Sequence, residues 1–281
     1  MIVYVSGRFC ALAEATVPVT DRGLLFGDGI YEVYRVYRGR PFRMKEHLTR
    51  LRRSAEAIRL ALPELHWETL HRELAEKNQL EAADATVYIQ VTRGAPEGRG
   101  HAFPPPETPP TVFVIPRPFR TPSAALWDDG AAVITRPDLR WGRCDIKSLN
   151  LLPNVLANQE AVEVGAWETV FVRDGVLTEG SHTNVFAVLD GCVRTHPRGP
   201  RILGGITREV VLELARDLGL RLRETPIELA DLPRAEEVFL TGTTVEVMPV
   251  VRVDGAPIAS GRPGPVARRL REAFRRLCDT T

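Results

Sequence analysis

The chain has 281 residues, a net charge of +1, 44% hydrophobic and 26% charged residues. This composition is typical of a globular protein with one large or two modest domains. Because the arginines are interleaved with acidic residues, we expect neither nucleic acid nor a membrane surface as a partner. No apolar run approaches the roughly 20 residues that span a bilayer, and the first residues do not resemble a signal peptide. The four cysteines are scattered without a Cys-x-x-Cys pair. We therefore expect no metal site and a cytoplasmic location.

The first part of the chain alternates between strand-like and helix-like patterns. The predicted elements are short strands over 1–40, helices over 44–62 and 67–80, and strands over 86–93 and 111–115. The stretch 94–110 is rich in Gly and Pro, so we expect it to be irregular. The Pro-rich stretch 116–122 is typical of a stiff connector.

The second part continues with mixed elements. The predictions are a strand over 131–136, a helix over 151–164, a hairpin of 169–172 and 176–179, a helix from 206 to about 218, a strand over 237–240 and a C-terminal helix. Strands outnumber helices and rarely form βαβ units, which favours an α+β fold. We place a small N-terminal domain at 1–117, a linker at 118–122 and a large C-terminal domain at 123–281, which carries Lys147.

Only three lysines occur among 37 basic residues: Lys45, Lys77 and Lys147. An arginine cannot replace a lysine that attacks a carbonyl, because the guanidinium stays protonated in proteins. Lys45 and Lys77 lie on the polar faces of predicted helices, whereas Lys147 lies between a strand and a helix. Lys147 is therefore the candidate for an imine with an aldehyde cofactor.

Such a cofactor needs a carboxylate against its ring nitrogen if the ring is to accept electrons. Glu179 ends a predicted hairpin strand and is followed by a polar turn, so it is the candidate. A surface glutamate at a strand end is the alternative interpretation.

A phosphate group on the cofactor needs N–H donors and a positive charge. Two glycines precede Ile206 and Thr207 at a predicted helix start, where free N–H groups and the helix dipole favour an anion. Thr207 is also a plausible N-cap. The hydroxyl-rich turn at Thr243 and the cation Arg50 are further candidates, although an arginine on a helix is commonly solvated.

A substrate carboxylate needs its own donors. Arg99 and His101 lie in the Gly- and Pro-rich stretch, and an arginine binds a carboxylate with two parallel hydrogen bonds. Tyr31 could add a hydroxyl, or it could be a half-buried strand aromatic.

These segments occur in one order along almost the whole chain and resemble the fold-type IV pyridoxal-phosphate enzymes, in particular the bacterial D-amino-acid aminotransferases. The matching segments are DRGLLFGDGIYE at 21–32, EHLTRL at 46–51, VTRG at 91–94, RGHAFP at 99–104, RCDIKSLN at 143–150, TEGS at 178–181, THP at 195–197, GITR at 205–208 and TTVEVMPV at 243–250. The segment around Lys147 is highly specific.

The resemblance implies a small α/β N-terminal domain, a larger pseudo-barrel C-terminal domain and a homodimer. It implies ping-pong transamination between D-amino acids, such as D-alanine or D-glutamate, and 2-oxoglutarate or pyruvate. It assigns pyridoxal 5′-phosphate to Lys147 and the pyridine nitrogen to Glu179. The phosphate is assigned to Arg50, Ile206, Thr207 and Thr243, and the substrate carboxylate to Tyr31, Arg99 and His101. In this family the last two come from the neighbouring subunit.

The chain departs from the family pattern in a loop one residue longer before Arg99, and in His182, Gly242 and Arg35, which replace the usual serines and a lysine. A branched-chain L-aminotransferase and an aminodeoxychorismate lyase are the alternatives on the same fold. A binding protein, or a hydrolase using Cys144 or a Ser/His pair, is the alternative from another class.

Overall fold

The structure is a computed structural model that describes residues 1–120 and 124–280. The described residues form two compact units. Unit 1 consists of Met1–Arg120 and Ile146–Asn150, and unit 2 consists of residues 124–145 and Leu151–Thr280. Each unit has its own sheet and its own hydrophobic core. The predicted α+β class is confirmed, and none of the described helices is long and apolar enough to cross a membrane.

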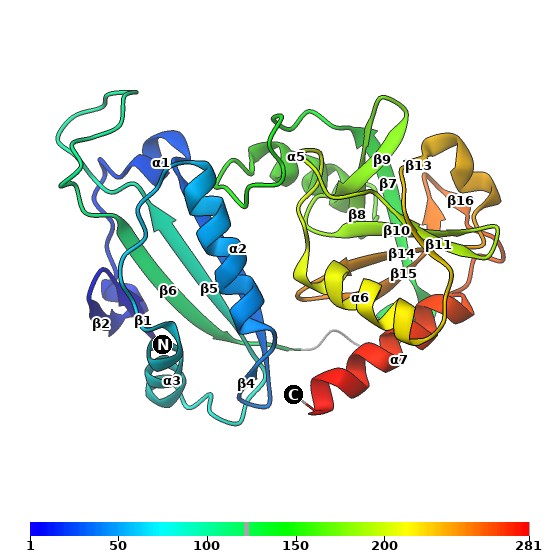
Figure 1. Ribbon diagram of the computed structural model, residues 1–281, viewed down its shortest axis with the longest axis horizontal. Coiled ribbons are helices and arrows are strands. Elements are labelled where there is room, and N and C mark those ends of the chain that lie inside the picture. The colour runs from blue at the N-terminus through cyan, green and yellow to red at the C-terminus, as the bar shows by residue number, and fades with distance from the viewer. Residues whose placement is uncertain (121–123, 281) are drawn as a thin grey trace. The chain divides into compact units, whose positions relative to one another are not determined.

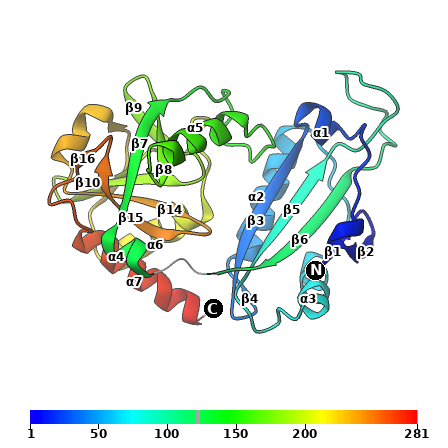
Figure 2. The same cartoon turned by 180° about the vertical axis from the view of Figure 1, so that it is seen from behind.

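Unit 1 is an antiparallel sheet in the order β2-β1-β6-β5-β3-β4. Figure 1 shows α2 lying along one face of this sheet, and Figure 2 shows the same sheet from behind. The elements are β1 (Ile2–Val5), β2 (Arg8–Ala11), the 3₁₀ helix η1 (Leu12–Glu14), α1 (Arg22–Phe26), β3 (Gly29–Tyr37), β4 (Arg40–Pro41), α2 (Met44–Ala57), α3 (Trp67–Asn78), β5 (Ala85–Thr92) and β6 (Thr111–Pro118).

Helix α2 packs on the sheet through residues at three- and four-residue spacing, among them Leu48, Leu51 and Ala55. It ends five residues earlier than predicted. Arg59 has a φ of +53°, and the Leu60 N–H returns to the Ala55 carbonyl at 2.9 Å. This closes the helix as a C-terminal capping turn does. Ile58 and Leu62 still pack against the core of unit 1, so the apolar spacing continues where the helix does not.

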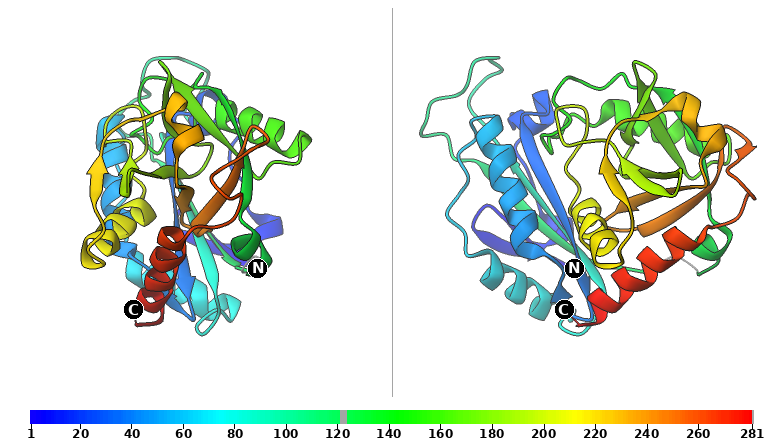
Figure 3. Two further views of the ribbon diagram at one scale, coloured as in Figure 1. Left: turned by 90° about the vertical axis from the view of Figure 1, so that its right-hand side faces the viewer. Right: turned by 45° about the vertical axis from the view of Figure 1, so that its right-hand side comes forward.

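Unit 2 contains a larger sheet in the order β12-β11-β10-β14-β15-β7-β8-β9-β13, with β16 paired to β15. It is mixed, since β7 runs parallel to both β8 and β15. Helices α6 and α7 lie side by side against it (Figure 3). The elements are α4 (Ala124–Asp129), β7 (Ala131–Pro137), α5 (Leu152–Glu163), β8 (Glu168–Arg173), β9 (Val176–Gly180), β10 (Asn184–Leu189), β11 (Cys192–Thr195), α6 (Ile206–Asp217), β12 (Leu222–Glu224), β13 (Ile227–Glu228), the 3₁₀ helix η2 (Leu229–Arg234), β14 (Glu237–Gly242), β15 (Glu246–Val253), β16 (Ala256–Pro257) and α7 (Pro265–Thr280).

The segment Ile146–Asn150 makes its contacts in unit 1, although the sequence analysis assigned it to the C-terminal domain. Ser148 forms a β-bridge with Ile30, and Ile146 lies in the core of unit 1. The predicted connector begins later than expected, because β6 continues through Pro118 as a strand paired opposite Ala85. Residues 121 and 122 of the predicted linker lie outside the described residues, so the boundaries of 117 and 123 stay a prediction.

Candidate active site

Three hydrogen bonds hold the backbone on both sides of Lys147 in unit 1. The Tyr31 N–H donates to the Lys147 carbonyl at 3.0 Å, and the Leu149 N–H donates to the Gly29 carbonyl at 3.1 Å. The Lys147 N–H donates to the Ser54 hydroxyl at 3.2 Å. The Nζ atom of Lys147 lies 4.1 Å from the centroid of the Tyr31 ring. The half-buried amine is thus held against an aromatic face at a fixed place beside β3.

Arg50 lies on the buried face of α2, not in solvent. Its Nη2 and Nε atoms donate to Oε1 and Oε2 of Glu32 at 2.6 and 2.9 Å. The Nδ1 atom of His47 lies 2.9 Å from Oε1 of the same carboxylate. Burial acts to raise the pKa of Glu32, but the charges of Arg50 and His47 outweigh it and hold that pKa well below its usual value. The ionised Glu32 therefore fixes the plane of the Arg50 guanidinium.

Arg99 and His101 are exposed, and the structure brings them together on one ring. The Arg99 guanidinium carbon lies 4.7 Å from the centroid of the Phe26 ring, and the His101 ring lies 5.2 Å from it. Tyr31 is half-buried and stacks on Tyr88 at 5.7 Å. Within the described part of the chain, no hydrogen bond or ring contact joins Tyr31 to Arg99 or His101.

In unit 2, Glu179 is only 5% exposed near the end of β9, so it is not a surface glutamate. Its Oε1 accepts from Nη1 of Arg140 at 2.5 Å. Its Oε2 accepts from Nδ2 of Asn184 at 3.0 Å and from the Leu203 N–H at 2.9 Å. Burial raises the pKa of Glu179 to about 7, although Arg140 and the Leu203 N–H act to lower it. A cation placed against this carboxylate would favour its ionised form.

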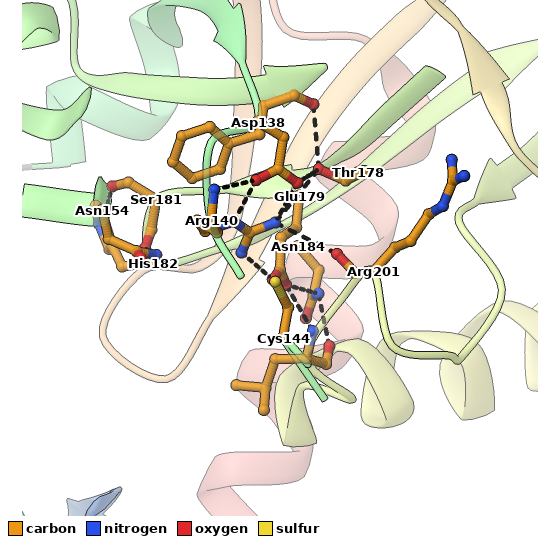
Figure 4. Close-up of polar contacts among 12 residues, drawn as sticks. Asp138, Arg140, Cys144, Asn154, Thr178, Glu179, Ser181, His182, Asn184 and Arg201 are labelled. Carbon is orange, nitrogen blue, oxygen red and sulfur yellow. Dashed lines mark hydrogen bonds and ion pairs between the residues drawn. The ribbon is translucent and has the colours of Figure 1, made fainter. Parts of the chain in front are cut away.

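A second carboxylate holds Arg140 in place (Figure 4). Nε and Nη2 of Arg140 donate to Oδ1 and Oδ2 of Asp138, both at 2.9 Å. Asp138 also pairs with Arg173 at 3.1 Å and accepts from the Thr178 hydroxyl at 3.1 Å. The sequence analysis missed Asp138 and Arg140. Their signal was a pair of opposite charges around an exposed leucine directly after a strand.

Helix α6 begins at Ile206, and its N-cap is Gly205, with no side chain capping the helix. Thr207 is therefore the second helical residue, and the prediction that it is the N-cap was wrong. Gly205 occupies that position because the chain passes very close to Asn184: a Cβ on Gly205 would lie 2.1 Å from Oδ1 of Asn184. An uncapped helix start preceded by glycines suits an anion.

Asn184 joins the parts of unit 2 that were predicted to bind a cofactor. It bonds to Glu179, approaches Gly205 and pairs across the sheet with Thr241. The turn that contains the half-buried Thr243 follows Thr241 directly. The Thr241 hydroxyl is buried and has no hydrogen-bond partner among the described residues. Unit 2 thus brings Glu179, the start of α6 and the Thr243 turn around one asparagine.

His182, one of the departures from the family pattern, is fixed by a buried carboxylate. Its Nδ1 lies 2.9 Å from Oε2 of Glu168, and its side chain is half exposed. Burial acts to raise the pKa of Glu168, but the hydrogen bond from His182 and further donors hold it below its usual value. His182 is therefore an ordered part of the turn after Glu179. Among residues 1–120 and 124–280, no His, Cys, Asp and Glu side chains group as a metal site.

Comparison with known proteins gives a family and close relatives. Residues 29–253 match the family Amino-transferase class IV. The chain is 42% identical over 280 residues to a D-alanine aminotransferase of Staphylococcus aureus (strain N315), covering 99% of this chain and 98% of that one. Its fold is similar to that of an Escherichia coli branched-chain amino acid aminotransferase, with a TM-score of 0.91, 29% identity and coverage of 98% and 94%. A branched-chain amino acid aminotransferase of T.th., complexed with N-(5′-phosphopyridoxyl)-L-glutamate, matches with a TM-score of 0.89, 32% identity and coverage of 99% and 93%.

The family match covers well over half of the chain, and the identity extends over nearly all of it. This chain therefore belongs to the class IV aminotransferase family. It is an aminotransferase with the fold-type IV architecture that the sequence resemblance implied.

The first prediction concerns the buried cluster of Glu32, His47 and Arg50. Glu32→Gln should lower the free energy of unfolding by about 3–5 kcal/mol, because it leaves the Arg50 charge buried without its partner. Chemical denaturation at neutral pH measures this change. Because the pKa of Glu32 is lowered from 4.5, the wild-type advantage should be fully present above pH 4.5 and decline as the pH falls below it.

Glu46→Gln on the same helix is the matched control. Its carboxylate is 43% exposed and pairs with Arg43, so its loss should cost less than about 1 kcal/mol. Equal effects of the two substitutions would contradict a stabilising role for the buried cluster.

Proposed function

We propose that this chain transfers amino groups between D-amino acids, such as D-alanine or D-glutamate, and 2-oxo acids, such as 2-oxoglutarate or pyruvate. The observation that carries the proposal is its 42% identity, over 99% of the chain, to an enzyme named D-alanine aminotransferase. Among the site residues proposed below, Lys147, Arg50, Glu179, Tyr31, Arg99 and His101 have the side-chain contacts described above. A cytoplasmic location is part of the proposal and is compatible with its four free cysteines.

The proposed cofactor is pyridoxal 5′-phosphate, and the chemistry of the side chains fits it. The buried Glu179 is a partner for a protonated ring nitrogen. The uncapped start of α6 at Ile206 and Thr207, together with the Thr243 turn, suits a phosphate. Arg50 supplies the positive charge. When bound, this group supplies an aldehyde for reversible attachment to an amine and a ring that accepts an electron pair from the substrate.

Lys147 performs the proton transfers in this proposal. Its Nζ, beside Tyr31, would hold the cofactor through the aldehyde and, once the substrate amine has replaced it there, would take the proton from the substrate Cα. The same amine would then give the proton back, and water would release the 2-oxo acid. A second 2-oxo acid reverses these steps. A positioned acid–base group contributes roughly 10²–10⁴-fold to the rate.

The handedness follows from the position of the substrate carboxylate. Only the hydrogen that points at Nζ of Lys147 is removed, so the residues that bind the carboxylate select the enantiomer. We assign this role to Tyr31, Arg99 and His101. The two exposed side chains lie against the same Phe26 ring, which brings two hydrogen-bond donors close together.

We further propose a homodimer in which Arg99 and His101 complete the site of the neighbouring subunit. Helix α5 supports an interface, since it exposes apolar side chains at helical spacing: Leu152 at 68%, Val155 at 59%, Leu156 at 57% and Val162 at 60%. An exposed apolar stripe of this kind is typical of a surface that another chain covers.

Branched-chain L-aminotransferase activity is the second candidate. It is favoured by the similar folds of the Escherichia coli and T.th. branched-chain enzymes, at 29% and 32% identity. We rank it below D-amino-acid transamination because the identity to the D-alanine aminotransferase is higher, at 42%.

The test of the proposed function compares enantiomers. With 2-oxoglutarate as acceptor, we expect pyruvate to form from D-alanine and little 2-oxo acid to form from L-alanine or L-leucine. Detecting each 2-oxo acid by mass spectrometry measures this. Activity on L-leucine without activity on D-alanine would favour the second candidate.

Lys147→Ala should abolish this turnover. It should also abolish the covalent cofactor label that borohydride reduction of an imine leaves at position 147, while the circular dichroism spectrum is retained. Lys45→Ala is the matched control, because Lys45 is exposed on α2. Transamination by the Lys147 variant at the wild-type rate would refute the assignment of this amine.

Arg99→Met should lower kcat/KM for D-alanine by roughly 10- to 100-fold, mainly through KM, because a charge-assisted hydrogen bond is lost. Steady-state kinetics measure the change. Arg53→Met, an exposed arginine on α2, should leave the kinetics unaltered. If both variants behave like the wild type, another residue binds the carboxylate.

Leu156→Asp should shift the protein from dimer to monomer in light scattering, since it buries a charge in the proposed interface. Arg216→Asp is the control: it places the same residue on α6, with a larger change in charge, at a side chain that is 59% exposed. An unchanged dimer for Leu156→Asp would contradict an interface at α5.

A further inference from the structure

Arg22 is a buried arginine whose guanidinium donates hydrogen bonds to three consecutive backbone carbonyls of the loop that carries Arg99 and His101. Nη1 donates to the Gly100 carbonyl at 2.6 Å and to the Ala102 carbonyl at 3.1 Å. Nη2 donates to the His101 carbonyl at 3.2 Å. Arg22 is only 4% exposed. Because three adjacent carbonyls converge on one planar cation, the backbone of this loop has a defined curvature.

The guanidinium of Arg22 is itself held in place. Its Nε donates to Oδ2 of Asp28 at 2.8 Å, and Nε of Arg93 donates to the same oxygen at 2.9 Å. Arg93 also donates to the Ile58 and Arg59 carbonyls, both at 2.7 Å, at the end of α2. Burial acts to raise the pKa of Asp28, but the hydrogen bonds and charges of Arg93 and Arg22 hold it below its usual value. Arg22, which we call the anchor of the loop, is thus linked through Asp28 and Arg93 to the ends of β5 and α2.

The helix that contains Arg22 is built to present it. Asp21 caps this short helix by accepting from the Gly23 N–H at 2.8 Å, and it also accepts from the Thr92 hydroxyl at 2.8 Å. Gly23 is required there, because a Cβ would lie 2.3 Å from the Thr92 methyl. Each residue of the Asp21-Arg22-Gly23 sequence therefore has a structural reason to be present.

Phe26, one turn after Arg22, connects the anchor to the two exposed side chains. The guanidinium carbon of Arg22 lies 4.8 Å from the Phe26 centroid. The guanidinium of Arg99 and the ring of His101 lie against the same phenyl ring. The backbone contacts fix where this part of the loop lies, and Phe26 fixes where its two side chains rest.

The loop needs such an anchor, because its sequence cannot order it. Residues 94–110 contain no helix or strand, and Gly98 and Gly100 flank Arg99. Glycine gains the most freedom when a chain is unrestrained. Without external contacts, Arg99 would sample many positions, and a carboxylate would have to order it on binding.

We propose that Arg22 is a positioning residue that orders Arg99 and His101 in advance for the carboxylate of the substrate, with Phe26 as the surface on which both side chains rest. The proposal depends on the proposed function, in which these two side chains bind that carboxylate. It does not require Arg22 to touch the substrate.

The test uses Arg22→Met, Arg22→Lys and Phe26→Leu in the cofactor-loaded enzyme and has two measurements. Kinetics with D-alanine should show KM raised about tenfold or more for Arg22→Met, with a smaller change in kcat, because the interactions lost are those that order the binding loop. Arg22→Lys should restore part of the loss, since it keeps the charge and can reach one carbonyl. Phe26→Leu should raise KM without changing any charge.

The second measurement is the rate of trypsin cleavage after Arg99, followed by mass spectrometry, which does not depend on activity. It should rise about tenfold or more in Arg22→Met, because release of three carbonyls frees the loop for the protease. Arg35→Lys is the matched control. Arg35 is also buried in unit 1 and pairs with Asp84, so its replacement should lower stability without altering KM or the cleavage rate at Arg99.

The outcomes separate the two proposals. The wild-type enzyme could prove inactive on D-alanine and still be cleaved after Arg99 more slowly than Arg22→Met. That result would overturn the proposed function but would support the ordering of the loop by Arg22. Active variants with an unchanged KM would overturn the positioning role, whether or not cleavage rises. If Arg22→Met does not fold, Arg22→Lys and Phe26→Leu decide the question by the same criteria.

Discussion

A charge removed from water must be matched by a charge or by hydrogen-bond donors, and the proposed site of this protein depends on that constraint. It is met three times by an acidic residue held between donors. Glu32 lies between Arg50 and His47, Asp28 between Arg22 and Arg93, and Glu179 accepts from Arg140, Asn184 and the Leu203 N–H. Each cluster fixes the direction of one group. For Arg50 and Glu179 that group is proposed to meet the cofactor, and for Arg22 it is the loop proposed to meet the substrate.

The arginines in these buried clusters illustrate the same constraint. Arg140 makes two parallel bonds to Asp138 with its Nε and Nη2, which leaves Nη1 for Glu179. A lysine offers a single ammonium without a fixed plane and could not divide its donors in this way. Lysine remains at Lys147, where we propose that an amine is needed, and on the exposed surfaces of α2 and α3 at Lys45 and Lys77. In the buried clusters, the fixed plane of the arginine guanidinium therefore supplies a geometry that a lysine could not.

The sequence predicted what local patterns encode. Apolar spacing located α2, the glycines before Ile206 located the start of α6, and helix-like patterns located α3 and α5. The Asp-Gly turn located the β8–β9 hairpin, and the Gly and Pro content of 94–110 indicated irregular backbone. The sequence-based predictions failed where a residue distant in the sequence determines the local structure. The apolar spacing of α2 continues to Ile58 and Leu62, but the capping turn at Arg59 ends the helix. Thr207 was assigned a capping role because the approach of Asn184 to Gly205 has no local signal.

The sequence analysis missed Asp138 and Arg140 for the same reason. Arg140 and Glu179 are 39 positions apart, and Asp28 and Arg93 are 65 apart. No spacing rule links residues over such distances, because the sheet decides which of them meet. In sequence, Arg22 is one of 37 basic residues. Only the convergence of three carbonyls on it distinguishes it from a surface charge.

Enzymes named for different substrates share this scaffold. Proteins described as D-alanine and as branched-chain aminotransferases both match this chain over nearly its full length, so the sheets and helices do not by themselves determine the preferred substrate. The parts proposed to hold the cofactor lie on helices, strands and tight turns: α2, β9, the start of α6 and the β14–β15 turn. Arg99 and His101 lie instead in a stretch without regular structure, where insertions and changes of sequence disturb no sheet. A loop can hold a carboxylate with one handedness only if it is rigid, and here that rigidity comes from a buried arginine outside the loop. On this argument, the parts that we propose to select the enantiomer are the exposed loop residues together with the Asp21-Arg22-Gly23 turn that orders them, while the parts proposed to bind the cofactor would serve either class of substrate.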